Sequence, residues 1–155
     1  MIQTSDNLIL KTIARVVSPF FMVYGFYVLI HGHYSPGGGF QSGVMLGATL
    51  ILLTVSMGSE YVQGKISNRT IFTLGGIGAF IYAGIAALCM ALGKNVLDYS
   101  ALAPILGMAV PDARSYGILG VEVGVTITVG SVMYAIFIIL VTGEENDWSD
   151  SFTKS

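Results

Sequence analysis

The chain has 155 residues, of which 54% are hydrophobic and only 10% are charged, and its mean hydropathy is +0.76. A soluble domain carries about 25% charged residues because water must wet its surface. This composition therefore excludes an ordinary soluble protein and predicts an all-α integral membrane protein. The net charge of −2, without a basic cluster, excludes nucleic acid as a partner, and the single cysteine, Cys89, excludes a disulfide framework or an iron–sulfur site.

Four segments are long and apolar enough to cross a bilayer as helices. Crossing takes about 20 residues, and a helix satisfies every backbone polar group internally. The segments cover residues 8–30, 40–57, 70–92 and 116–142. Ser67 or Asn68 is placed to cap the third span, and the fourth contains a single charge, Glu122. We predict one membrane domain, residues 1–155, with four transmembrane helices and a polar tail at 143–155.

The positive residues predict the orientation, because Lys and Arg concentrate on the cytoplasmic side of a membrane. One side of this four-span layout holds Lys11, Arg15, Lys65, Arg69 and Lys154, and the other holds Lys94 and Arg114. We therefore expect both termini to face the cytoplasm. The third connection, residues 93–115, contains the apolar run "ALAPILGMAV", which is too short to span and predicts an interfacial or re-entrant piece.

Small residues recur every four positions in three of the spans. Inside lipid, helices associate through such residues because their backbones can approach closely. The repeats are Gly43 and Gly47 in the second span, Gly75, Ala79, Ala83 and Ala87 in the third, and Gly120 and Gly124 in the fourth. Two interpretations are open. The four helices pack on one another as a bundle, or some of these faces receive helices of other subunits.

The connection between the first two spans, "HGHYSPGGGFQSG", is the most unusual stretch. A metal site needs three or four ligands, and the two histidines have no nearby carboxylate or cysteine. A phosphate loop needs a preceding strand and a following Lys-Ser/Thr pair, which are absent. A tight membrane hairpin accounts for every residue of the motif, since proline ends a helix and glycines allow close backbone approach. Its structural residues are Pro36, Gly37, Gly38, Gly39, Phe40 and Gly43.

Three ionisable residues are candidates for an ion path or a proton relay. His31 and His33 lie in the hairpin, at the expected water boundary, and a histidine there relays protons at neutral pH or has a structural role. Glu122 is the lone acid of the spans. A carboxylate deep in the bilayer indicates an ion path. If the fourth helix instead begins near Tyr116, Glu122 lies close to its start, where the helix dipole or Arg114 stabilises it.

The hairpin motif resembles that of the MnhB/MrpB-like subunit of the Mrp-type Na⁺/H⁺ antiporters, and equally that of the corresponding subunit of membrane-bound hydrogenase-type complexes. The matching residues are Gly32, His33, Pro36, Gly37, Gly38, Gly39, Phe40 and Gly43, with a weaker match at Glu122, Gly124 and Val125. Ser42 departs from the pattern, because many relatives have glycine there. The resemblance implies a small, non-catalytic subunit of a multisubunit complex in the cytoplasmic (inner) membrane of a prokaryote. Large antiporter-like subunits and other small subunits are its partners, and Na⁺ and H⁺ are the transported ions.

Other functions remain as alternatives. The sequence shows no nucleophile–base pair, acid dyad or nucleotide motif, so we expect neither an enzyme nor a cofactor in this chain. The first alternative is the equivalent subunit of a membrane-bound hydrogenase or sulfur-reducing respiratory complex, whose redox centres lie on other chains. The second is a stand-alone, homodimeric small transporter that uses Glu122 as its proton-coupled carboxylate.

Overall fold

The computed structural model describes residues 6–32 and 37–142. Within these ranges the chain is helical and has no strand. Its elements are α1 (Asp6–Ile30), α2 (Gly39–Met57), α3 (Ser59–Gln63), α4 (Asn68–Ala91), the 3₁₀ helix η1 (Tyr99–Leu102), α5 (Ala103–Leu106) and α6 (Val110–Thr142). Four of them, α1, α2, α4 and α6, are long and apolar enough to span a membrane. The prediction of an all-α protein with four transmembrane helices is therefore confirmed.

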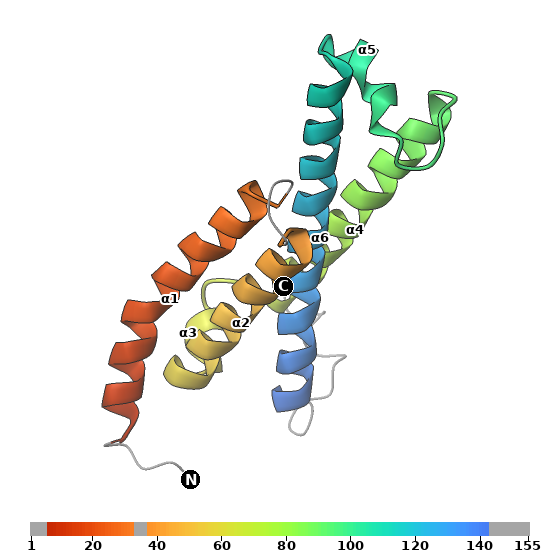
Figure 1. Ribbon diagram of the computed structural model, residues 1–155. Coiled ribbons are helices and arrows are strands. Elements are labelled where there is room, and N and C mark those ends of the chain that lie inside the picture. Colours follow the sequence, from red (N-terminus) through yellow and green to blue (C-terminus); the bar gives the residue numbers. More distant parts are fainter. Residues whose placement is uncertain (1–5, 33–36, 143–155) are drawn as a thin grey trace.

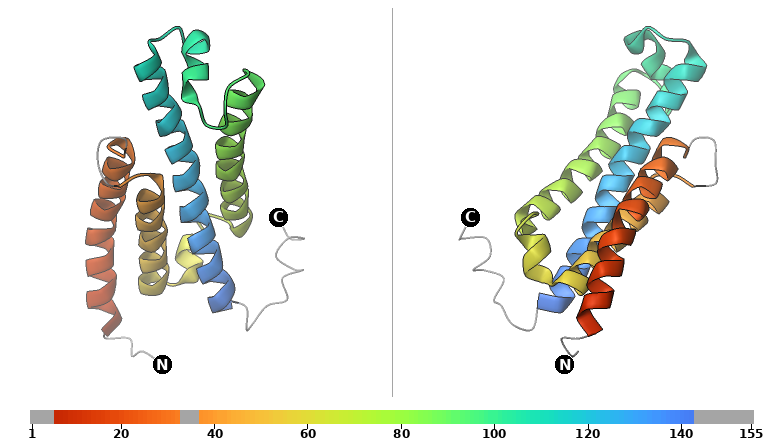
Figure 2. Two further views of the ribbon diagram at one scale, coloured as in Figure 1. Left: turned by 45° about the vertical axis from the view of Figure 1, so that its right-hand side comes forward. Right: turned by 90° about the vertical axis from the view of Figure 1, so that its left-hand side faces the viewer.

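The four long helices lie side by side in the order α1, α2, α6, α4 (Figures 1 and 2). Helix α6 packs against both α2 and α4, whereas α1 packs mainly on α2. The layout is thus a row rather than a closed bundle, and α1 and α4 form its two sides. The start of α1, the end of α2 and the end of α6 lie at one end of the molecule, as the predicted hairpin topology requires.

Local sequence signals explain where two of these helices begin. The side chain of Ser67 caps α4 by accepting a hydrogen bond from the Thr70 amide at 3.3 Å, which confirms one of the two predicted caps. Helix α6 begins at Val110, six residues before the predicted start. Pro111 fits this earlier start because proline is tolerated in the first turn of a helix, where its missing amide costs no helical hydrogen bond. Asp112, also in this turn, is favoured by the helix dipole.

Two small apolar clusters hold the ends of the row together. At one end, α3, α4 and α6 meet around Val62, Ile71 and Tyr134. The ring of Tyr134 is fully buried, and its hydroxyl lies 3.0 Å from Oγ1 of Thr54 on α2. At the other end, residues of η1 and α5 pack on Ala113 near the start of α6. The apolar run of the third connection therefore forms two short helices that do not span, as its length predicts.

Candidate functional site: the glycine corner and Glu122

The beginning of α2 presses directly on the backbone of α6. A Cβ atom built on Gly39 would overlap the carbonyl oxygen of Glu122 and lie 2.8 Å from its Cα. Because atoms of both backbones limit this approach, only glycine fits at Gly39. The close contact continues along the two helices, where a Cβ on Gly43 would lie 2.8 Å from the Thr126 carbonyl oxygen. The glycines therefore bring α2 onto α6 at the level of Glu122.

The carboxyl group of Glu122 lies between the end of α1 and the start of α2. A Cβ on Gly32 would be 2.7 Å from Oε1 of Glu122, and one on Gly38 would be 2.8 Å from the same oxygen. Gly32 lies just beyond the last residue of α1, and Gly38 precedes the first residue of α2. The structure thus joins two sequence candidates, the hairpin glycines and the acid, in one site. We call the glycines 32, 38 and 39 the glycine corner.

Glu122 lies well inside α6 rather than at its start. It lies twelve positions after Val110, the first residue of the helix, which corresponds to about 18 Å along the axis. The influence of a helix dipole fades within the first turn, so the interpretation of Glu122 as an acid of that turn is wrong. Asp112 holds that place. The glycine corner is consequently packed beside α6, far from its beginning (Figure 1).

The hydroxyl of Thr126 continues the polar site one helical turn beyond Glu122. Thr126 follows Glu122 by four residues on α6, and its hydroxyl donates to the carbonyl oxygen of Gly39 at 2.9 Å. Ser42 lies on α2 and is completely buried. The sequence held a signal for Thr126, because residues four apart share one face of a helix. Its bond to the first residue of α2 depended on how the helices dock.

The remaining hairpin candidates lie apart from this polar site or outside the described residues. His31 is exposed and stacks on Tyr27, with ring centroids 4.2 Å apart, while its Nδ1 lies 3.0 Å from the Tyr27 carbonyl oxygen. Phe40 is 67% exposed, so its ring faces away from the chain's own core. His33 and Pro36 fall outside the residues that the structure describes. The side chains of His31 and Phe40 are therefore available to surrounding lipid or to other chains.

Of the predicted packing residues, the glycines make contacts within the chain. Gly47 of α2 lies against Gly130 of α6, where an added Cβ would be 3.1 Å from the Gly130 carbonyl oxygen. Gly124 of α6 meets α4 at Gly78, where a Cβ on Gly124 would be 2.9 Å from the Gly78 carbonyl oxygen. Gly75 approaches Ser131 at an ordinary distance of 3.6 Å. Sequence reasoning missed Gly78, although its spacing of three from Gly75 places both on one face.

The alanines of the same predicted repeat do not face α6. Ala79, Ala83 and Ala87 are exposed, whereas Gly75 is buried. Four residues advance an α-helix by slightly more than one turn, so an every-four repeat rotates by about 40° at each step. By Ala87 the direction has turned well away from Gly75. The hypothesis that these alanines receive another subunit's helix stays a prediction. Gly120, on α6, contacts Ile85 of α4.

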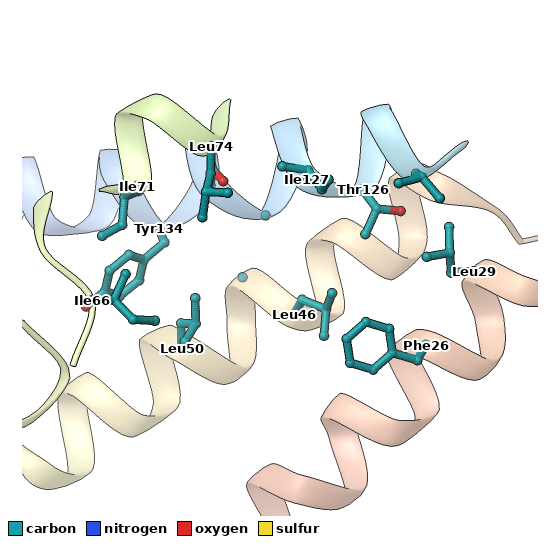
Figure 3. Close-up of a pocket in the computed structure, with 14 residues that line it drawn as sticks. Phe26, Leu29, Leu46, Leu50, Ile66, Ile71, Leu74, Thr126, Ile127 and Tyr134 are labelled. Atoms are coloured by element: carbon teal, nitrogen blue, oxygen red, sulfur yellow. The ribbon is translucent and has the colours of Figure 1, made fainter. Parts of the chain in front are cut away.

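An apolar cavity of about 330 Å³ lies next to the polar site, between the four long helices (Figure 3). Thr126 of α6 and Leu29 of α1 lie at one end of it, beside the start of α2. Tyr134 and Ile66 line its other end. Among the described residues, the site thus consists of the Glu122 carboxyl group and the neighbouring Thr126 hydroxyl and Gly39 carbonyl oxygen, next to an apolar cavity. A carboxyl group inside a spanning helix is typical of sites that bind a proton or a cation.

Comparison with known proteins places this arrangement in a family. The family model described as "Domain related to MnhB subunit of Na+/H+ antiporter" matches residues 9–135, which include the glycine corner and Glu122. The chain belongs to the MnhB family. It is 30% identical over 139 residues to the B subunit of the Na(+)/H(+) antiporter of Bacillus subtilis (strain 168), covering 82% of this chain and 92% of that protein. It is 31% identical over 132 residues to the putative antiporter subunit mnhB2 of Staphylococcus aureus (strain Newman), covering 80% and 92%.

Membership in the MnhB family confirms the resemblance that the hairpin motif carries. It supports the leading interpretation of the sequence, a small subunit of a multisubunit antiporter. It does not favour a stand-alone transporter or a redox complex. Because the match extends from α1 into α6, the corner and the acid that meets it both belong to the MnhB domain.

Proposed function

We propose that this MnhB-family chain is a non-catalytic subunit of a multisubunit Na⁺/H⁺ antiporter in the cytoplasmic membrane of a prokaryote, and that Glu122 belongs to the ion path of the complex. The observation that carries the proposal is the position of the Glu122 carboxyl group in the glycine corner, about 18 Å from the start of a spanning helix. Intramembrane acids are costly and are typical of ion pathways.

The glycine corner suits a carboxylate that exchanges a proton or a cation. Gly32 and Gly38 border the Glu122 carboxyl group without side chains, so its oxygens pack directly against the backbone at the end of α1 and the start of α2. A Cβ at either position would come within 3 Å of Oε1, and the carboxyl group would have to move. The two glycines therefore allow the acid to occupy this position, while the cavity beyond Thr126 is lined almost entirely by apolar atoms.

The exposed faces of the row supply the second part of the proposal, which is assembly. Helix α1 packs mainly on α2 and exposes large apolar side chains such as Phe20, Val23 and Tyr27. On the other side, α4 exposes Ala79 and Ala83. Small residues permit close helix–helix approach in lipid. We assign these two sides to contacts with other membrane subunits, large antiporter-like ones and small ones. Both termini are assigned to the cytoplasm.

The test uses Glu122→Gln in the complete antiporter, with Asp112→Asn as the matched control. Both residues are acids of α6, and Asp112 lies exposed in its first turn. Na⁺/H⁺ antiport is measured in everted membrane vesicles, and the recovered complex is quantified through a tag on this chain. We expect Glu122→Gln to lower antiport by about tenfold or more at unchanged complex yield, and Asp112→Asn to leave it unchanged. Full antiport by Glu122→Gln, or transport by the lone chain in liposomes, contradicts the proposal.

A further inference from the structure

Thr126 forms a hydrogen bond between two helices, whereas four other buried hydroxyl residues bond within their own helix. In a transmembrane helix a hydroxyl commonly donates to the carbonyl oxygen four residues earlier. Four buried side chains do so at 2.6–2.9 Å, namely Ser18, Thr49, Thr54 and Ser56. Thr126 is 4% exposed, and its hydroxyl donates instead to the carbonyl oxygen of Gly39, 87 positions away in the chain, at 2.9 Å. This bond therefore ties α6 to α2 rather than stabilising α6 alone.

The bond between Thr126 and Gly39 lies directly beside Glu122. The carbonyl oxygen four residues before Thr126 is that of Glu122, and a Cβ on Gly39 would overlap this oxygen. One turn further along α2, a Cβ on Gly43 would lie 2.8 Å from the carbonyl oxygen of Thr126. The first turn of α2 is thus held on α6 by close backbone contacts at Glu122 and Thr126 and by one side-chain hydrogen bond.

The hydrogen bond fixes where the start of α2 lies along α6. Close packing of glycines limits how near two backbones come, but a hydrogen bond also depends on the alignment of its donor and acceptor. A shift of α2 by one residue, about 1.5 Å along its axis, would spoil the geometry between the Thr126 hydroxyl and the Gly39 oxygen. Gly38 directly precedes Gly39, and a Cβ on Gly38 would lie 2.8 Å from Oε1 of Glu122. The bond therefore also sets the position of the glycine corner relative to the carboxyl group.

We propose that Thr126 is a positioning residue of the antiporter, whose hydroxyl keeps the glycine corner docked beside Glu122 in the arrangement that binds the transported ion. This inference rests on the proposed function, in which Glu122 belongs to the ion path. Without the hydroxyl, the start of α2 is docked in a smaller fraction of the complexes, and the apparent affinity for the ion falls with that fraction. A saturating ion concentration restores the docked arrangement, so the maximal rate is kept.

The experiment measures antiport as a function of Na⁺ concentration in liposomes that contain the purified intact complex. Thr126→Val removes the hydroxyl and keeps the branched shape of the side chain, whereas Thr126→Ser keeps the hydroxyl. The control is Thr49→Val, which removes a buried hydroxyl of α2 that is bonded to Met45 of the same helix. Loss of one hydrogen bond predicts a rise of about fivefold in the KM for Na⁺ in Thr126→Val, with the maximal rate kept within about twofold. Thr126→Ser and Thr49→Val are expected to keep the KM of the parent complex.

Glu122→Gln, measured in parallel, separates this inference from the proposed function. If Thr126→Val keeps the parent KM while Glu122→Gln loses antiport, the role of Thr126 is refuted and the proposed function stands. If Glu122→Gln is fully active, both are refuted. An equal rise of the KM in Thr126→Ser or Thr49→Val would also refute the role of Thr126, since it would show an effect of altered packing or of lost hydroxyls in general. Should Thr126→Val fail to assemble, Thr126→Ala decides by the same measurement, because alanine removes the hydroxyl and is a good helix former.

Discussion

Replacing Gly78 by alanine tests whether the contact between α4 and α6 is limited by backbone atoms. A Cβ at this position would lie 2.6 Å from the carbonyl oxygen of Gly124 and 2.7 Å from the amide nitrogen of Thr128. Ordinary contacts begin at 3.4 Å, so α4 must move away from α6 by about 0.8 Å, since neither backbone atom can rotate aside. Gly84→Ala is the matched control, because Gly84 lies on the same helix and has nothing within 4 Å of an added Cβ.

The expected magnitude follows from two opposing effects. Overpacking of a tight contact costs about 1–3 kcal/mol, and replacing glycine by alanine inside a helix gains about 1 kcal/mol. Gly78→Ala should therefore destabilise the chain by up to about 2 kcal/mol, while Gly84→Ala should be neutral or stabilising. The assay is the temperature at which the detergent-solubilised full chain loses its monodisperse chromatographic peak. Equal midpoints for the two variants would refute the reasoning, because they would show that α4 and α6 do not approach as closely as described.

Three further changes probe other parts of the chain. Thr54 donates its own hydroxyl hydrogen to Leu50, so the Tyr134 hydroxyl is the donor to Thr54, and Tyr134→Phe should lower the stability of the chain by about 1 kcal/mol. Thr54→Val should lower it more, because the buried Tyr134 hydroxyl then loses its hydrogen-bond partner. Equal thermal midpoints for the two variants would contradict this. Phe40→Ala should leave the stability of the lone chain nearly unchanged, because the ring is 67% exposed. The same variant should reduce the amount of complex recovered by affinity purification. Unaltered recovery would argue against a contact between Phe40 and another subunit. Hydrogen bonds from the Ser100 hydroxyl and amide hold the pKa of Asp98 below its usual value. The stability that this gives is present above the usual pKa and is lost as the pH falls through the lowered one, so Ser100→Ala should raise the Asp98 pKa in an NMR titration.

The helices themselves could be predicted from sequence with few errors. Hydropathy predicts the number of spans. The cap of α4 could be predicted because serine is a preferred residue before the first turn of a helix, and Ser67 stands there. The start of α6 was predicted six residues too late, although Pro111 is compatible with the first turn of a helix. The packing faces were predicted only in part. Glycines such as Gly47 and Gly124 do contact neighbouring helices, but a fixed four-residue spacing rotates around α4 and leaves Ala83 exposed.

The sequence predicted the hairpin glycines and Glu122 as two independent candidates. The hairpin motif indicated close backbone approach, and the lone charge singled out Glu122, yet nothing in either segment showed that one would border the other. Ser42 was noted only as a departure from a glycine pattern. Its complete burial could not be predicted, because it depends on how α2 packs on the neighbouring helices.

The sequence by itself determined that the chain is a four-span helical membrane protein, because in lipid each helix must satisfy its own backbone and a sufficiently long apolar segment has no other stable state. Only the tertiary structure decided which helices are neighbours. Inside lipid there is no general hydrophobic force between helices, so their order depends on how closely particular glycines let two backbones approach. That fit brought Gly39 onto Glu122, residues far apart in the chain, and so created the polar site on which the proposed function depends.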